Sequence, residues 1–179
     1  MKIRQSHDQD IKKIMQIHVD AFGAKEGPIV SELIKNLLND PTAIPQLSLV
    51  AEENRDLIGH ITFSKVEIEE TQQQLESRIL GPLAVAPKAM KQGIGSKLVM
   101  TGCEQLMQSG VNLIFVYGDP NYYSRFGFTT ASKIGLLPPH PIPIEYEEAW
   151  MVKKLTANIP NNMNSKIKCC KALNDPIHW

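Results

Sequence analysis

The stretch that decides the fold is Arg78–Gly110, RILGPLAVAPKAMKQGIGSKLVMTGCEQLMQSG. It opens with an apolar run at 79–85, tightens into QGIGS at 92–96 and continues with apolar residues at helical spacing. This order predicts a strand, a turn and a helix. A helix N-terminus offers unpaired N–H groups and about half a positive charge, and glycine lets the backbone approach a ligand closely. The stretch therefore predicts a loop that binds phosphate groups, such as those of a diphosphate-bearing cofactor.

The spacing of this loop excludes two common nucleotide-binding loops. A dinucleotide fingerprint needs a third small residue where Leu98 stands, and an ATPase phosphate loop needs Gly-Lys-Ser/Thr where GSK stands at 95–97. The loop instead resembles the acyl-CoA loop of the GNAT superfamily of N-acetyltransferases, whose pattern is Gln/Arg-x-x-Gly-x-Gly/Ala after a strand like LAVAP at 83–87. Met90 departs from that pattern, because Gln or Arg is usual there. The short GxG alone fits a glycine-rich turn between an ordinary strand and helix equally well.

The resemblance implies a fold and a cofactor. The fold is the α/β GNAT fold, a mixed and mostly antiparallel sheet flanked by helices, in which parallel strands at 79–85 and 111–117 splay apart around the pantetheine arm of acetyl-CoA. A helix connects these two strands, which independently predicts that they are parallel. The residues expected to bind acetyl-CoA, mainly through backbone N–H groups, are Leu83, Ala84, Val85, Lys91, Gln92, Gly93, Ile94, Gly95 and Ser96.

A second motif, GDPNYYSRFGF, occupies residues 118–128. Asp119 is expected to cap a short helix that Pro120 opens and Gly127 ends. In GNAT enzymes a Tyr four residues before a Gly-Phe pair commonly lies near the cofactor sulfur, and Tyr123 holds that position. Together, LGPLAV with the glycine loop and GDPxYYxRFGF look like one bacterial subgroup of N-acetyltransferases. The resemblance covers the chain from Met1 to about residue 155.

The chemistry of acetyl transfer assigns roles to these residues. It needs a neutral amine, donors for the developing oxyanion and a proton for the departing thiolate. Tyr123 is the predicted general acid, because a phenol is protonated at neutral pH. Glu26 or His60 is the candidate general base, and N–H groups near Ala84 and Val85 are candidate donors to the carbonyl. No Cys or Ser stands in a nucleophilic constellation, which predicts direct transfer in a ternary complex.

Composition limits the other functions. The chain has 179 residues, 42% of them hydrophobic, which suits one well-filled core. Nineteen basic and nineteen acidic residues give a net charge of zero, so neither nucleic acid nor an anionic membrane is an expected partner. No apolar run approaches the ~20 residues that span a bilayer, and the N-terminus lacks the apolar core of a signal peptide. The three cysteines, Cys103, Cys169 and Cys170, lack the regular spacing of a disulfide framework, which predicts a reducing, cytoplasmic location. The histidines lack the spacing of metal ligands.

Outside the two motifs, periodicity supplies most of the secondary structure. It predicts a strand at 2–5, helices on either side of a break at residues 23–27, with the second after Pro28, and a hairpin of strands at 47–51 and 57–63. The polar stretch Glu67–Ser77 is expected to be a strand end and loop without function. A proline-rich loop at 136–144 is either a surface connection or a wall of the acceptor pocket.

The predicted domain organisation is an N-acetyltransferase domain at 1–155 and an extension at 156–179 that forms a loop and an exposed edge strand packed on the same domain. The predicted function is transfer of the acetyl group of acetyl-CoA to an amine of an unidentified small molecule or protein, by a monomer or homodimer. A non-catalytic acyl-CoA sensor is the alternative, because the general base is not evident from the sequence.

Overall fold

The computed structural model describes residues 1–69 and 74–179. Part of the expected loop at Glu67–Ser77 lies outside the described residues. The helices and strands, in chain order, are β1 (Lys2–Gln5), α1 (Ile11–Leu38), β2 (Leu47–Glu53), β3 (Asp56–Ile68), β4 (Ser77–Val85), α2 (Ile94–Gln108), β5 (Leu113–Tyr117), α3 (Pro120–Tyr123), β6 (Thr129–Thr130), β7 (Leu136–Leu137), β8 (Trp150–Lys154) and β9 (Ser165–Cys169).

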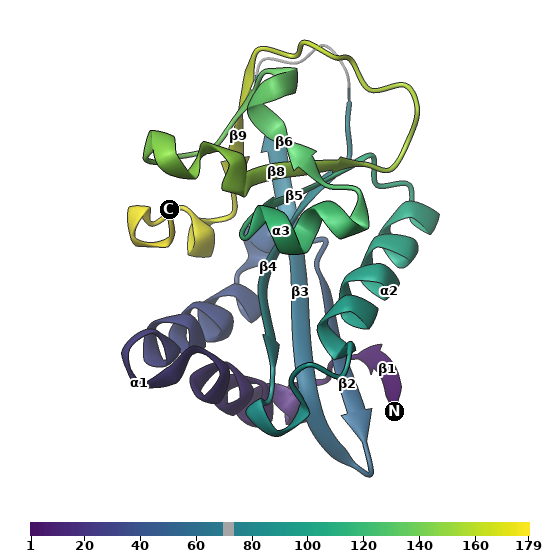
Figure 1. The fold of residues 1–179 in the computed structure, drawn as a ribbon, viewed down its shortest axis with the longest axis vertical. Helices are drawn as coiled ribbons and strands as arrows, with labels where there is room; N and C mark the ends of the chain where they lie inside the picture. Colours follow the sequence, from purple (N-terminus) through teal and green to yellow (C-terminus); the bar gives the residue numbers. More distant parts are fainter. Residues whose placement is uncertain (70–73) are drawn as a thin grey trace.

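A mixed sheet forms the centre of the molecule, with α1 and α2 flanking it (Figure 1). Its strand order is β1-β2-β3-β4-β5-β8-β6, and along this path β4 and β5 are parallel while the other pairs are antiparallel. The hairpin predicted at 47–51 and 57–63 is formed by β2 and β3, and the parallel pair predicted at 79–85 and 111–117 is formed by β4 and β5. The expected fold, an α/β arrangement with a mostly antiparallel sheet, is confirmed.

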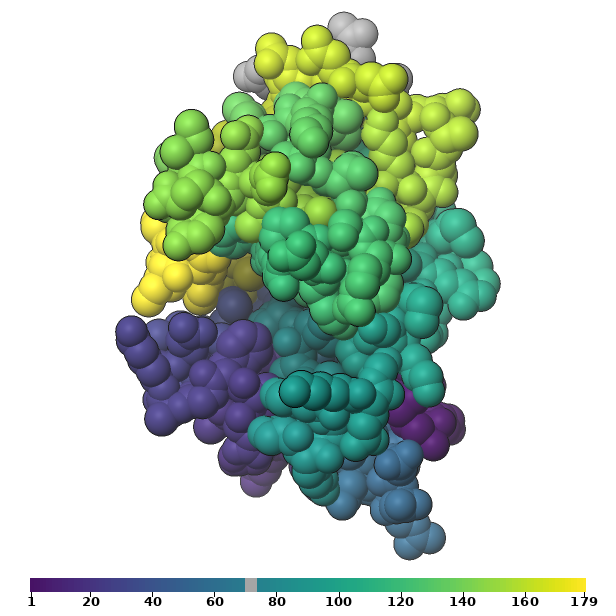
Figure 2. All heavy atoms as spheres, in the orientation of Figure 1, coloured from purple at the N-terminus to yellow at the C-terminus, as the bar shows by residue number. Residues whose placement is uncertain are grey.

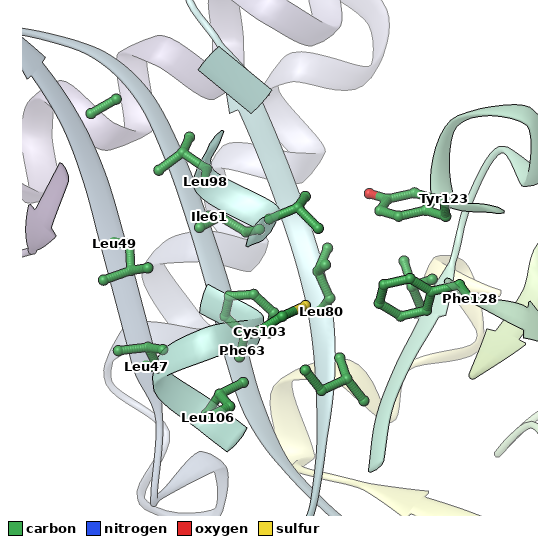
Figure 3. Close-up of a cluster of buried hydrophobic side chains, with 14 of the residues drawn as sticks. Leu47, Leu49, Ile61, Phe63, Leu80, Leu98, Cys103, Leu106, Tyr123 and Phe128 are labelled. Carbon is green, nitrogen blue, oxygen red and sulfur yellow. The ribbon is translucent and has the colours of Figure 1, made fainter. Parts of the chain in front are cut away.

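Each face of the sheet is covered by one of the two long helices. Leu98 of α2 packs in a cluster with Ile61 and Phe63 of β3 (Figure 3). On the other face, Ile14 of α1 packs in a cluster with Val50 of β2. Gly102 lets α2 approach the sheet closely, because a Cβ at this position would lie 2.2 Å from the Phe63 ring. The helical period of α2 therefore serves packing against the sheet, while its N-terminal turn is left at the surface.

Helix α1 differs from the sequence prediction. The backbone bends sharply at Gly23, where φ is 74° and ψ is −175°, but the helix resumes at residue 24 and carries Pro28 inside it. The expectation of a second helix beginning after Pro28 is therefore wrong. Close contact between the two parts of α1 explains the need for Gly27, since a Cβ there would lie 2.5 Å from the Val19 carbonyl oxygen. Beyond the bend, Leu33 packs in a cluster with Ile79 of β4, and Ile34 packs in another with Ala84 of β4.

Strand β4 contains a β-bulge. Ile61 of β3 pairs with Leu83, and Phe63 pairs with Leu80, so β4 has an extra residue at Gly81-Pro82. Gly81 has a φ of 146°, which a residue with a side chain rarely adopts. The extra residue changes which side chains share a face: Leu80, Leu83 and Val85 pack on the α2 side, whereas Ala84 packs on the α1 side.

The last part of the chain is tied to the rest of the fold. Strand β9 pairs antiparallel with the end of β3 and parallel with β7, so the expectation of an exposed edge strand is wrong. Beyond β9, the carboxylate of Asp40, just after α1, accepts the N–H of Ala172 at 2.8 Å, and the Thr42 hydroxyl accepts the N–H of Lys171 at 2.9 Å. These bonds hold residues 171–179 beside α1.

Candidate active site

The predicted phosphate-binding loop lies at the N-terminus of α2. Gly93 is the N-cap residue, with a left-handed φ of 76°, and the first N–H bonded within the helix is that of Lys97, to the Gly93 carbonyl at 3.0 Å. The N–H groups of Ile94, Gly95 and Ser96 thus belong to the turn that lacks intrahelical acceptors. Lys91 and Gln92 are exposed beside them. These groups and the helix dipole suit a diphosphate.

Gly95 sits in a narrow position within this loop. A Cβ here would lie 2.7 Å from the hydroxyl of Tyr122 on α3 and 3.6 Å from a methyl carbon of Val85 on β4. The missing side chain therefore leaves room between the helix start, β4 and α3. A residue with a Cβ at the second glycine of the loop would therefore require the Tyr122 side chain to move.

A gap opens between β4 and β5. Their pairing ends at Leu80 and Val116, although β4 continues to Val85. The Ala86 N–H donates to the Ile58 carbonyl of β3, and backbone groups alternate in direction along a strand. The N–H groups of Leu83 and Val85 therefore face the gap, whereas that of Ala84 faces β3. The expectation that Ala84 offers its N–H to a ligand is wrong for this reason.

A cavity of about 580 Å³ lies at the mouth of this gap. Figure 2 shows the surface hollowed between the purple atoms of α1 and the green atoms of the α3 region. The residues that line the cavity come from four separate parts of the chain, which are α1, β4, the stretch from the end of β5 to α3, and the last seven residues: Phe22, Glu26, Ile29, Val30, Leu33, Ile79, Leu80, Gly81, Pro82, Leu83, Val116, Tyr117, Gly118, Asp119, Tyr123, Leu173, Ile177, His178 and Trp179.

Tyr123 faces this cavity from α3. The Asp119 carboxylate caps α3 by accepting the Asn121 N–H at 2.9 Å, and Gly118 leaves room for the Tyr123 ring, which would lie 2.5 Å from a Cβ there. The hydroxyl points across the gap toward the strand that carries Leu80 (Figure 3). Burial, and then the neighbouring Tyr122 and Asp119, raise the pKa of the Tyr123 phenol. The phenol is therefore protonated at neutral pH and is able to donate.

The two candidate bases have different surroundings. Glu26, three residues past the bend in α1, lines the cavity. His60 does not line it and is fully buried on the α1 side of the sheet. The structure therefore brings Glu26 together with Tyr123 and separates His60 from both.

His60 instead belongs to a buried chain of hydrogen bonds. Its Nδ1 is 2.9 Å from His18 Nε2 on α1, its Nε2 is 2.9 Å from the Ser48 hydroxyl, and that hydroxyl is 2.6 Å from the hydroxyl of Ser6. Burial lowers the pKa of His18 to about 4 and, together with the nearby His18, lowers that of His60. Both imidazoles are neutral at pH 7, and their bonds attach α1 to the sheet.

The cysteines are poorly suited to nucleophilic catalysis. Cys103, Cys169 and Cys170 are buried, and none lines the cavity. Burial raises the pKa of Cys103 to about 11 and also raises those of the other two thiols. A thiol with a raised pKa is a weak nucleophile, because the thiolate is the reactive form. Within the described residues, no group of His, Cys, Asp and Glu side chains is arranged to hold a metal ion.

Several cavity residues are not identifiable from the sequence. Phe22, Ile29 and Trp179 carry no motif, because their spacing is explained by helix packing or lies in a short terminal segment. The proline-rich loop, for which a wall of the acceptor pocket is one of two expectations, instead lines a different cavity of about 520 Å³ that includes Leu137, Ile142 and Ile144. The last residues of the chain take the place expected for that loop.

Comparison with known proteins identifies the family. The family model described as "Acetyltransferase (GNAT) domain" matches residues 2–131. The chain belongs to the GNAT acetyltransferase family. It is 36% identical over 162 residues to the N-acetyltransferase YjhQ of Escherichia coli (strain K12), an alignment that covers 89% of this chain and 87% of YjhQ.

Solved structures of GNAT proteins share the whole fold. The crystal structure of the GNAT N-acetyltransferase YhbS from Escherichia coli in complex with CoA matches with a TM-score of 0.85 and 27% identity, over 98% of this chain and 92% of YhbS. A GNAT acetyltransferase from Brucella melitensis in complex with acetyl-CoA matches with a TM-score of 0.75 and 28% identity, over 96% and 97% of the two chains. Among the described residues, no helix is both long and apolar enough to cross a bilayer.

Proposed function

We propose that the protein transfers the acetyl group of acetyl-CoA directly to an amine in the cavity between α1 and α3. The observation that carries this proposal is that the β4–β5 gap leads from the glycine loop of α2 to a cavity lined by both Tyr123 and Glu26. Two structurally similar GNAT proteins were solved with CoA or acetyl-CoA, which supports the same cofactor here. The family match favours an enzyme over a non-catalytic sensor.

The residues present fit acetyl-CoA along the length of the gap. The unpaired N–H groups at 94–96 would hold its diphosphate, and Lys91 and Gln92 flank that position. The N–H groups of Leu83 and Val85 would bind the pantetheine arm, because they face the gap and lack a strand partner on that side. When bound, acetyl-CoA supplies a thioester whose carbonyl carbon is open to attack by an amine.

Tyr123 and Glu26 would serve the two proton transfers. Glu26 accepts the proton that the amine must lose before or during formation of the new C–N bond. As the C–S bond breaks, Tyr123 donates its phenolic proton to the departing thiolate. The buried cysteines and their raised pKa values favour this direct route over an acyl-enzyme.

We also propose that LGPLAV and GDPxYYxRFGF mark a narrower subgroup of the GNAT family, and four of their residues have a structural reason. Gly81 in LGPLAV takes the positive φ of the bulge. In GDPxYYxRFGF, Asp119 caps α3, Gly118 makes room for the ring of Tyr123, and Gly127 has a φ of 82° where the turn ends. The motif residues thus shape the gap from both sides.

The proposal is tested by following CoA thiol release with a broad panel of amines. Tyr123→Phe should lower turnover by about 10²–10⁴-fold while leaving the affinity for acetyl-CoA unchanged, because only the proton donor is lost. Tyr146→Phe is the matched control, since Tyr146 is exposed and does not line the cavity. Unchanged turnover in Tyr123→Phe would remove this residue from the role of acid.

A further inference from the structure

The cavity is mainly apolar, and its apolar side chains extend to its rim. Phe22, Ile29 and Ile177 all line it, yet they are 37%, 45% and 65% exposed. When a ligand covers large apolar side chains at the border of a pocket, the complex is stabilised by about 25 cal/mol per Å² of apolar surface removed from water. The rim therefore favours a ligand with an apolar body.

The aromatic wall of the cavity is rigid. The rings of Tyr117 and Trp179 stack with centroids 6.0 Å apart at 18°. The Trp179 indole N–H donates to the Leu173 carbonyl at 2.8 Å, and the ring also lies edge-on to Trp150 at 5.7 Å. A fixed aromatic surface binds a compact ring with little loss of side-chain freedom.

The charges in the cavity are few and of one sign. Glu26 and Asp119 are the carboxylates, and Asp119 already caps α3. No lysine or arginine is found among the described residues that line it. Burial lowers the pKa of His178, so this side chain adds no positive charge at neutral pH. Glu26 is therefore the cavity carboxylate that does not cap a helix.

The charges of the cavity favour an acceptor with one positive charge and no negative charge. One ammonium group would be matched by Glu26, whereas a second would reach only Asp119, whose Oδ1 already accepts the Asn121 N–H. A carboxylate or phosphate on the acceptor would lie near Glu26 with no cation to balance it. The charge pattern thus disfavours amino acids, polyamines and sugars with several amines.

We propose that the acceptor is a monoamine carried on an apolar, ring-sized body without an acidic group. This inference rests on the proposed acetyl transfer and names the substrate class of the same site. The cavity volume of about 580 Å³ must hold the thioester end of the cofactor as well, which limits the body to about the size of one ring. A lysine side chain of a protein lacks this apolar body, and it enters the test as a competing outcome.

The experiment compares acceptors that differ in their charged groups and in the apolar ring. We expect kcat/KM for 2-phenylethylamine to exceed that for phenylalanine, which adds a carboxylate, by about 100-fold. It should exceed the value for 1,4-diaminobutane, which lacks the ring and adds an ammonium group, by a similar factor. A lysine-containing peptide is measured alongside. Equal or faster transfer to phenylalanine, 1,4-diaminobutane or the peptide would overturn the inference.

A charge placed at the rim gives a second, independent measurement. Ile177→Lys should shift the preference toward phenylalanine at least 10-fold, because the new ammonium group balances its carboxylate. Ile177 is 65% exposed, so the substitution is compatible with folding. Ile144→Lys is the matched control: Ile144 is 85% exposed and borders the other cavity, so the preference should not change. An equal shift in both variants would show a general charge effect and contradict the assignment.

Failure of the proposed function has a different signature. A protein that neither binds acetyl-CoA in calorimetry nor releases thiol with any amine would refute acetyl transfer and, with it, the inference. Binding of acetyl-CoA with transfer to other acceptors, or to none of the apolar monoamines, would overturn the substrate class alone.

Discussion

The cofactor side and the acceptor side of the gap are built in opposite ways. The proposed cofactor site uses a continuous stretch, from Leu83 to Ser96, and mostly backbone N–H groups. The acceptor cavity uses side chains from α1, β4, the end of β5, the α3 region and the last seven residues. Backbone groups recognise features common to every acyl-CoA, whereas side chains at a chain junction are free to differ. We therefore expect substitutions to affect one site without the other, except at Leu83, which belongs to both.

The strongest test of this separation is Gly95→Asp. The new side chain would meet the Tyr122 hydroxyl and place a negative charge where we propose the diphosphate binds. We expect the affinity for acetyl-CoA, measured by calorimetry, to fall by about 10³-fold, or about 4 kcal/mol. Gln108→Asp adds the same charge at the other end of α2 and should leave the affinity unchanged. An intact affinity in Gly95→Asp would disprove the cofactor site.

The stability of the fold should fall in acid, because His18 holds the first part of α1, which leads to the acceptor side, to the sheet. The pKa of His18 is about 4 in the folded chain and about 6.5 when unfolded. Above pH 6.5 the side chain is neutral in both states. As pH falls from 6.5 to 4 the unfolded chain takes up the proton first, so the free energy of unfolding should drop by about 3 kcal/mol and then level off.

Urea unfolding at pH 7 and pH 4 measures this loss, with His18→Gln as the control that cannot titrate. The variant should lose less stability between the two pH values than the native protein. His60, whose pKa is lowered by burial and by His18, acts in the same direction. Identical losses in both proteins would assign the acid sensitivity to other groups.

A smaller effect is expected where the two walls of the cavity are joined. Asp40→Ala would leave the N–H groups of Ala172 and Thr42 without their acceptor, at a cost of about 2 kcal/mol in the free energy of unfolding. The KM for the acceptor should rise while that for acetyl-CoA stays constant. Asp56→Ala removes an exposed carboxylate with long ion pairs and should cost less than about 1 kcal/mol. A changed KM for acetyl-CoA would show that the two sides are coupled.

The same contrast explains what the sequence can predict. Strand β4, the glycine loop and α2 are contiguous, so the order and spacing of their residues predict them directly. The short helix α3 is predictable because Asp119, Pro120 and Gly127 have local roles in it, whereas the role of Tyr123 is implied by its position in the GNAT-like motif. The cavity residues Phe22, Ile177 and Trp179 meet only after α1 bends and the chain end packs against it, and no local rule encodes that meeting. The sequence alone leaves His60 as a candidate base, because its hydrogen-bond partner, His18, is 42 residues away in the chain and is not predictable from local spacing.

The bulge at Gly81-Pro82 shifts by one residue the alternation of side chains between the two faces of β4. Upstream of it Leu80 faces α2, and downstream the odd-numbered Leu83 and Val85 do so. A chain shortened by one residue here would turn Ala84 toward α2 and Leu83 and Val85 toward α1, and it would reverse which N–H groups face the gap. Single-residue deletions in this strand should therefore be far less tolerable than substitutions. The length of the LGPLAV segment, and not only its residue types, determines which side chains and N–H groups face the gap.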